Sequence, residues 1–155
     1  MNTGIYIVYY QNKPYEFETE FLIPIAAGDL TNEWKKKDKL NDQINNNISE
    51  LNNYFRELSA HYNIWKNNFY DKEIVGFYHY RRYLNLIKLD DSNNERLYLE
   101  PTKEVLNFIS DTNQISNAEK ILTTYDIIVP EKFKLKTNFS SHFCIEHNQE
   151  IWQDF

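Results

Sequence analysis

The densest group of chemically capable side chains lies at residues 79–83, His-Tyr-Arg-Arg-Tyr. His79, Arg81 and Arg82 follow an apolar run directly, in a chain whose formal net charge is -6. Guanidinium groups match phosphate oxygens in a bidentate manner, so this segment is a candidate for binding the phosphates of a ligand. The tyrosines beside them could stack on a base or a sugar. The alternative is a pair of surface arginines that cover apolar neighbours and pair with nearby carboxylates.

Three short apolar runs are typical of buried strands: residues 5–10, 73–78 and 125–129, the last ended by a proline. None alternates cleanly between apolar and polar residues, which is typical of strands covered on both faces in a parallel sheet. Ligands of open α/β sheets bind beyond the carboxyl ends of the strands. If 73–78 is a central strand, Arg81 and Arg82 leave the sheet where the phosphates of a ligand would lie.

Helical periodicity is found between these runs. Apolar residues recur at steps of three or four over residues 50–66, which predicts one long helix that packs a single stripe on the sheet. The stripe consists of Leu51, Tyr54, Phe55, Leu58, Tyr62 and Trp65. Ser49 is the expected N-cap of this helix. Two later helices are expected, one from near Pro101 with Val105, Leu106 and Ile109, and one from about Asn117 with Ala118, Ile121 and Leu122.

Strands that alternate with helices predict an α/β fold, a three-layer, Rossmann-like and mostly parallel sheet with flanking helices. The first two strands should be parallel, because the crossover between them is too long for a hairpin. We expect a single domain over residues 1–155, and an ordered loop at 131–141. The chain ends on aromatic residues without the usual polar fraying, so we expect the fold to be truncated at its C-terminal side.

Composition excludes several classes of site. The chain has three glycines, at 4, 28 and 76, so it can form neither a Walker loop nor a dinucleotide-binding glycine fingerprint. Its one cysteine, Cys144, excludes an internal disulfide and a multi-cysteine zinc site, and favours a reducing cytoplasm. The acidic balance argues against general nucleic-acid binding. No apolar run approaches the ~18 residues of a membrane span, and the start lacks a signal-peptide pattern.

Other side chains are weaker candidates. Glu57 could orient an arginine or a sugar hydroxyl, although a cap or a local ion pair would explain it equally well. Asp42, Asn47 and Ser49 lie at a loop-to-helix junction where amides could face a ligand. A capping and Asx-turn cluster is the reading that we prefer there from the residues alone. His142 and His147 have the wrong spacing for a helix-borne zinc pair, so we expect no metal site.

The segment HYRRY, residues 79–83, resembles the signature of a bacterial family of glycosyltransferase-like proteins connected with capsular and exopolysaccharide synthesis, long known as a domain of unknown function. Further segments resemble the family's motifs in the same order: IPIAAG at 23–28, DQINNNIS at 42–49, YFRELSAHYNIWKN at 54–67 and YDIIVP at 125–130. The chain departs from the family at Asn45 and Asn46, where the family has Gly and Asp. It also has Tyr10-Gln11 where the family has His-Lys.

This resemblance implies a GT-A-like glycosyltransferase that takes a sugar, galactose or galactofuranose among the candidates, from a nucleotide-sugar, in particular a UDP-sugar. The acceptor would be a growing capsular, exopolysaccharide or lipopolysaccharide glycan or a lipid-linked oligosaccharide. Donor and phosphate contacts are expected at His79, Tyr80, Arg81, Arg82 and Tyr83, and supporting contacts at Asp42, Asn47, Glu57, Asp126 and His147. The catalytic group stays unassigned.

In transferases of this type an Asp-x-Asp motif after the corresponding strand holds a metal on the donor diphosphate. Because this chain has a pair of arginines there, we expect the cations to replace the metal, with no permanently bound cofactor. The expected location is the cytoplasm, with peripheral association at the inner membrane. The alternative function is a binding module without turnover, derived from a truncated transferase, that retains a nucleotide-sugar or glycan pocket. A phosphoester hydrolase is disfavoured, because no convincing cluster of metal ligands is present.

Overall fold

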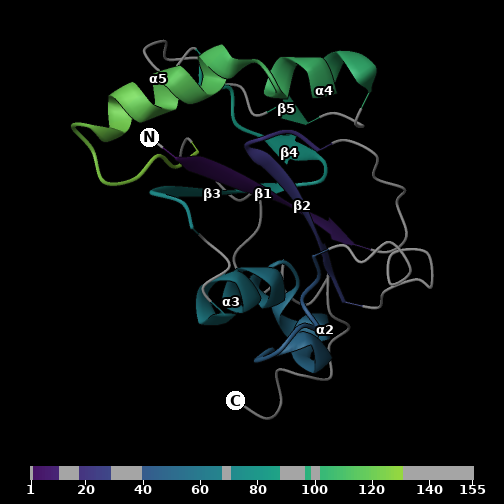
Figure 1. Cartoon of the computed structure of the whole chain (residues 1–155). Helices are drawn as coiled ribbons and strands as arrows, with labels where there is room; N and C mark the ends of the chain where they lie inside the picture. Colours follow the sequence, from purple (N-terminus) through teal and green to yellow (C-terminus); the bar gives the residue numbers. More distant parts are fainter. Residues whose placement is uncertain are drawn as a thin grey trace, which may run out of the picture.

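The computed structural model describes residues 2–10, 18–28, 40–67, 71–87, 97–98 and 102–130. They form a five-stranded sheet of order β2-β1-β3-β4-β5 with helices on both faces (Figure 1). The strands are β1 (Thr3–Tyr10), β2 (Leu22–Ala27), β3 (Ile74–His79), β4 (Arg82–Tyr83) and β5 (Leu97–Tyr98). The first three are parallel, and the two short strands are each antiparallel to their neighbour.

The predicted parallel pairing of the first and second predicted strands is confirmed. β1 and β3 are direct neighbours, with Ile5 opposite Gly76 and Val8 opposite His79. A side chain at Gly76 would place its Cβ 3.2 Å from Ile5 Cγ1, so the glycine allows the two strands to pack closely here. β1 is buried along nearly its whole length, as expected of a central strand covered on both faces.

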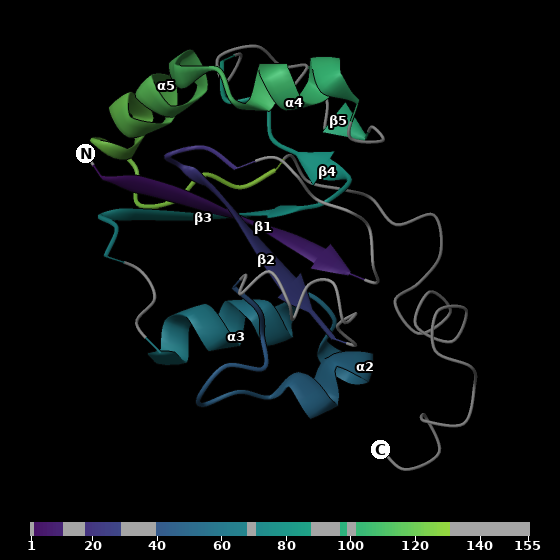
Figure 2. The same ribbon diagram turned by 45° about the vertical axis from the view of Figure 1, so that its right-hand side comes forward.

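The predicted three-layer arrangement is also confirmed. Helices α4 (Lys103–Ile109) and α5 (Thr112–Leu122) cover one face, while α2 (Asn52–Phe55) and α3 (Leu58–Asn67) lie on the other (Figures 1 and 2). Each face has its own apolar cluster. The cluster under α4 and α5 includes Ile5, Ile7, Tyr78, Val105 and Ile109, and the cluster under α3 includes Tyr6, Val8, Ile25, Ala60 and Ile64.

The strand predicted at 125–129 is wrong. These residues have no regular secondary structure, and Tyr125, Ile127 and Val129 are 64%, 71% and 64% exposed. Strand propensity reflects how well a residue fits the half-buried surface of a sheet, and residues 125–129 do not lie on such a surface. The outer edge of β3 is met instead by β4, which a two-residue turn brings back to His79. A local turn closes at a lower entropic cost than a distant strand.

Strand β2 was not among the predicted strands, although it lies at the edge of the sheet next to β1. Pro24 in its centre argues against a central strand, but proline is tolerated on an edge where its missing N–H faces outward. The Ala26 N–H donates outward to the Leu40 carbonyl at 3.1 Å, and Pro24 lies two residues earlier on the same side. The Leu22 N–H donates to the Thr19 hydroxyl oxygen at 3.0 Å.

The single long helix predicted over 50–66 is also wrong. A 3₁₀ turn (Ser49–Leu51) leads into α2, and Arg56, with a φ of 49°, separates α2 from α3. The predicted stripe faces outward, since Tyr54, Leu58 and Trp65 are 60%, 56% and 61% exposed. The buried face carries Asn52, Ser59, Ala60, Asn63 and Ile64 instead.

Polar side chains lie beside Ala60 and Ile64 on the buried face of α3, because amides there satisfy backbone groups of the preceding loop. Asn63 Nδ2 donates to the Ile44 carbonyl at 2.7 Å, and Asn67 Nδ2 donates to the Asn46 carbonyl at 2.9 Å. Backbone carbonyls that are turned away from water need such partners, which is consistent with the burial of Asn63. Ser49 is not an N-cap, because Ile48 holds that position and the Ser49 hydroxyl donates to Asn47 Oδ1.

The two later helices form as predicted in kind. α4 begins after Thr102, whose hydroxyl accepts from the Val105 N–H, and it buries Val105 and Ile109. α5 begins at Thr112 rather than near Asn117, because Asp111 is its N-cap and accepts from the Asn113 N–H. In the described ranges, no helix is both long enough and apolar enough to cross a membrane.

Candidate functional site at the carboxyl edge of the sheet

The carboxyl ends of three parallel strands meet at one edge of the sheet. β1 ends at Tyr10 and pairs there with Ala27, the last residue of β2, while β3 ends at His79 opposite Val8. The residues that follow these strands therefore share a rim, which we call the carboxyl edge. Open α/β sheets bind ligands at such an edge.

The turn from β3 to β4 places two arginines at the carboxyl edge. Arg81 and Arg82 are exposed, whereas Tyr80 and Tyr83 on either side of them are buried. The Tyr83 hydroxyl donates to the Tyr80 carbonyl at 2.6 Å, which closes the turn, and the Tyr80 N–H donates to Val8. The two tyrosines therefore hold the turn in place, and the two cations remain accessible.

Arg81 is oriented by its neighbours. Its guanidinium carbon lies 4.8 Å from the centre of the Tyr80 ring, a cation–π contact. Its backbone N–H donates to His79 Nδ1 at 3.2 Å. A histidine nitrogen that accepts a hydrogen bond carries no proton, so the proton of a neutral His79 lies on Nε2.

His79 connects the end of β3 to the other layer of the fold. Its Nε2 lies 3.3 Å from Glu57 Oε1, in the connection between α2 and α3. Burial lowers the pKa of His79, Glu57 opposes this shift, and Arg82 and Arg81 add to it. The lowered pKa and the Nδ1 contact both favour a neutral ring that carries its proton on Nε2, the nitrogen nearest the Glu57 carboxylate.

Beneath the edge, Asp42 joins the end of β2 to α3. Its Oδ2 accepts from the Gly28 N–H at 3.1 Å and lies 2.5 Å from Ser59 Oγ. Asn52 Nδ2 donates to the same Ser59 Oγ at 2.7 Å. Asp42 is fully buried, and burial raises the pKa of its carboxyl while the bonds with Ser59 and Gly28 oppose that rise.

Gly28 is needed at this position for two reasons. Its φ is +79°, a conformation that L side chains rarely adopt. A Cβ on this residue would lie 2.6 Å from Asn52 Oδ1 and 3.0 Å from Tyr10 Cε2. The end of β2 can therefore approach α2 and β1 only because residue 28 has no side chain.

A family model described as Domain of unknown function (DUF4422) matches residues 4–154. The chain belongs to this family. No curated protein is significantly similar to the chain. Among solved structures, one titled "WbbM bifunctional glycosytransferase apo structure" is similar to part of it, with 31% sequence identity and a TM-score of 0.44. That similarity covers 57% of this chain and 15% of the solved chain, so no shared fold or activity follows from it.

In this DUF4422 chain, the predicted donor contacts lie together in the β3–β4 turn, and Glu57 joins them through His79. Asp42 lies under the same edge but is fully buried. Asn47 is exposed and forms an Asx turn, accepting from the Ser49 N–H at 3.2 Å, which is the interpretation preferred from the residues alone. His147 and Cys144 lie outside the described residues.

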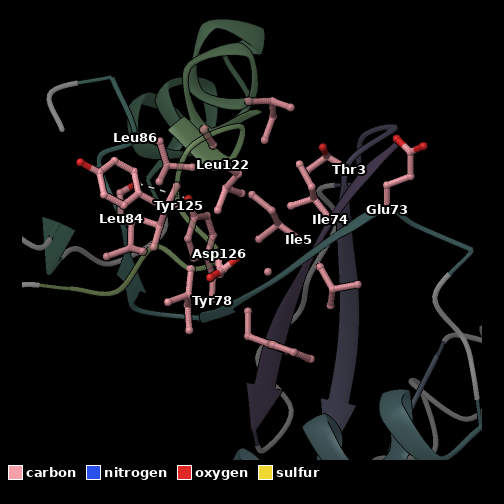
Figure 3. A pocket seen from close by; sticks show the side chains of 17 residues that line it. Thr3, Ile5, Glu73, Ile74, Tyr78, Leu84, Leu86, Leu122, Tyr125 and Asp126 are labelled. Carbon is pink, nitrogen blue, oxygen red and sulfur yellow. Dashed lines mark hydrogen bonds between the residues drawn. The ribbon is translucent and has the colours of Figure 1, made fainter. Parts of the chain in front are cut away.

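Asp126 lines a separate cavity of about 400 Å³ between β3, α5 and residues 125–128 (Figure 3). Thr3 and Glu73, at the amino ends of β1 and β3, line the same cavity. Asp126 is thus not shown in contact with the arginines of the DUF4422 domain. In the described ranges, no group of three His, Cys, Asp or Glu residues could hold a metal ion.

The residues of the site that the sequence did not single out are Gly28 and three buried polar residues, Asn52, Ser59 and Asn63. Asn52, Ser59, Asn63 and Asn67 recur at steps of seven and four, the spacing of one helix face. A polar stripe at helical spacing opposite an apolar one could have indicated which face the DUF4422 fold buries. The apolar stripe was the stronger pattern and pointed to the wrong face.

Proposed function

We propose that the carboxyl edge binds the diphosphate of a nucleotide-sugar, and that the chain is the donor-binding part of a glycosyltransferase. The observation that carries this proposal is the position of Arg81 and Arg82, exposed on the turn where a central parallel strand ends. Exposed guanidinium groups at this edge are accessible to phosphate oxygens, which they match in a bidentate manner. The motif resemblance along the chain points to the same class of enzyme.

The chemistry of transfer fits fixed cations. The bond between the anomeric carbon and the diphosphate oxygen breaks, and a hydroxyl oxygen of the acceptor bonds to that carbon. The leaving diphosphate gains negative charge as the bond breaks, so cations held beside it stabilise the transition state more than the substrate. Arg81 is already oriented over the Tyr80 ring, which reduces the cost of ordering it on binding.

Glu57 is the second element of the proposed site. Its carboxylate is partly exposed, and one of its oxygens, Oε1, lies 3.3 Å from His79 Nε2. The other oxygen can accept a hydrogen bond from a sugar hydroxyl. The neutral His79 fixes the direction in which the carboxylate points.

The donor we propose is a UDP-sugar, with galactose or galactofuranose as candidate sugars, and the acceptor is a glycan of the capsule, exopolysaccharide or lipopolysaccharide type. These finer assignments rest on the motif resemblance. We also propose that the two arginines act in place of a divalent metal on the diphosphate. Assembly of such glycans on lipid carriers would place the protein at the cytoplasmic face of the inner membrane.

Calorimetric titration of UDP and UDP-sugars into the wild-type chain and three variants tests the arginine role. Arg81→Ala and Arg82→Ala each remove a cation, and loss of a charged hydrogen bond should weaken binding by roughly 1.5–3 kcal/mol. Arg81→Lys should be nearly as weak, because the bidentate fork is lost. Lys103→Ala, an exposed cation on α4, is the matched control and should bind as wild type does.

Equal affinity in wild type and both alanine variants would contradict the proposal. Repeating the titration with EDTA tests the metal, since binding that EDTA abolishes requires one. A transfer assay with the same UDP-sugars separates enzyme from binding module. Donor binding without turnover, in the longest natural form of the chain, would favour the module.

A further inference from the structure

The buried carboxyl of Asp42 has an uneven set of hydrogen bonds. Both of its side-chain partners, the Gly28 N–H and the Ser59 hydroxyl, contact Oδ2. Oδ1 is buried and has no hydrogen-bond partner in the part of the chain that the structure describes. The residue is 0% exposed, so bulk solvent does not reach this oxygen.

In the part of the chain that the structure describes, no cation contributes to the pKa of this carboxyl. The elements packed against it are the end of β2, α2 and α3, whose polar groups facing it are the Gly28 amide, Asn52, Ser59 and Asn63. Among the charged groups on these elements, Glu57 contacts His79, His61 stacks on Phe77, and Glu50 and Lys66 are exposed. Arg56 is partly exposed, and it is not a hydrogen-bond partner of either oxygen of the carboxyl.

An ionised Asp42 would therefore be an uncompensated buried charge with two neutral donors on one oxygen, an arrangement that costs several kcal/mol. A proton on Oδ2 removes this difficulty. Asp42 then donates to Ser59 Oγ, and the Ser59 hydroxyl donates to the Arg56 carbonyl at 3.0 Å. Asn52 Nδ2 donates to the same Ser59 oxygen, and Oδ1 becomes a neutral carbonyl oxygen, which is less costly to leave unpaired.

We propose that Asp42 is a neutral carboxylic acid in the folded protein at pH 7, and that it acts as a positioning residue for the carboxyl edge. The chain of contacts Gly28–Asp42–Ser59 joins the end of β2 to the first turn of α3. Glu57 lies two residues before Ser59 and reaches His79 from this fixed turn. Burial of the carboxyl, which raises its pKa, acts in the same direction.

The inference does not depend on nucleotide-sugar binding, so each can fail without the other. Denaturant unfolding of wild type and Asp42→Asn between pH 4.5 and 8 tests it, because asparagine keeps the shape and a donor but does not titrate. A folded pKa above the unfolded one means that stability is lost as pH rises. The unfolding constant of wild type relative to D42N should increase up to about tenfold per pH unit above the unfolded pKa of about 3.9, until the folded pKa is reached.

A ratio that stays constant with pH, or that falls as pH rises, would overturn the proposal. Infrared spectra of the wild type give a second test, which does not depend on the folding of any variant. At pH 7 we expect the C=O stretching band of a protonated acid, and this band should disappear when denaturant unfolds the protein. Its absence from the folded spectrum would overturn the proposal.

The positioning role has a separate readout. D42N should keep the contact of His79 with Glu57, so the pH at which His79 titrates, followed by NMR, should not move. Ser59→Ala breaks the connection to α3, and the His79 titration should then shift. If His79 titrates in S59A as it does in wild type, Asp42 does not position the edge.

Discussion

At the scale of single residues, Gly28 shows how one backbone conformation holds the candidate site together. Its positive φ is unfavourable for a residue with a Cβ, and a Cβ at this position would also clash with the Asn52 side chain. We expect Gly28→Ala to lower the free energy of unfolding by about 1–3 kcal/mol, since the substitution adds backbone strain and a clash. Denaturant unfolding measures this.

Gly4→Ala is the matched control for that experiment. A Cβ at Gly4 would meet Lys72 Cγ at 2.8 Å, but a flexible lysine side chain can move away. The backbone there is an ordinary strand that alanine can adopt. The two variants should differ clearly in stability. If Gly28→Ala is as stable as Gly4→Ala, the positive φ at residue 28 is not a constraint.

From the lowered pKa of His79 we expect the free energy of unfolding to depend on pH with a sign opposite to that expected for Asp42. Burial lowers the folded pKa of His79, so below the unfolded pKa of about 6.5 the unfolded state binds more protons than the folded state. Stability from this group is therefore present above pH 6.5 and is lost as pH falls towards the folded pKa. We expect the unfolding constant of wild type relative to His79→Gln to rise on acidification from pH 7.5 to 5.5.

This ratio isolates His79 from the other titrating groups, which both proteins share. His61 is also buried with a lowered pKa, and it contributes equally to the two unfolding curves. An unfolding ratio that does not change between pH 7.5 and 5.5 would mean that His79 titrates alike in both states, and the neutral ring assigned to it would then be incorrect.

At the scale of elements, the face of α3 is the feature to test. Ile64 is 1% exposed and packs in the cluster with Tyr6, Val8 and Ala60, whereas Leu58 is 56% exposed. Ile64→Ala should lower the free energy of unfolding by roughly 2–5 kcal/mol, as truncations in a packed core do. Leu58→Ala should change it by less than about 0.5 kcal/mol. Thermal or denaturant unfolding compares the two variants. A larger loss of stability in Leu58→Ala would mean that α3 buries the face predicted from the apolar stripe.

The elements that could be predicted are those whose patterns have one physical solution. The run 5–10 is apolar throughout and is buried along nearly its whole length, whereas the run 73–78 is partly exposed. The long crossover between the two runs favours parallel pairing. The helix from 103 has its capping residue and its buried valine and isoleucine at helical spacing. Each of these depends on local chemistry, so a single sequence suffices.

The rest depends on contacts between distant residues. Arg56 breaks the long helix with a positive φ that its own sequence does not demand, because Asn52 and Ser59 both bond its carbonyl. The position of Arg81 and Arg82 at the carboxyl edge was predicted, but Glu57 meets His79 and not an arginine. The hydrogen bonds of Asp42 join a loop, a strand end and a helix, and no residue spacing along the chain predicts those contacts.

At the scale of the whole molecule, local stability should differ strongly between the centre of the sheet and residues 125–130. β1 is paired on both sides and buried on both faces, whereas Tyr125, Ile127 and Val129 are exposed beside the cavity. Amide hydrogen exchange followed by mass spectrometry should show the slowest exchange in peptides of β1. Peptides of residues 125–130 should exchange within the shortest labelling times.

The comparison has an internal reference in β3, which pairs fully with β1 and only at His79 with β4. Its peptides should be intermediate. Protection of residues 125–130 as strong as that of β1 would mean that they form a hydrogen-bonded strand in solution, as their sequence first indicated. Exchange measured at two pH values separates such protection from slow intrinsic chemistry.

The edge formed by β2 bears on whether copies of this molecule can add to one another's sheets. Its outward donors fall at three positions: Leu22 is bonded to Thr19, Ala26 is bonded to Leu40, and Pro24 has no N–H at all. The outward carbonyls of Leu22 and Ala26 have partners too, because they accept from the Thr19 N–H at 3.2 Å and from the Asp42 N–H at 2.8 Å. An incoming strand from a second molecule would find neither a donor nor an acceptor at these two positions, so β2 is a poor template for fibril growth.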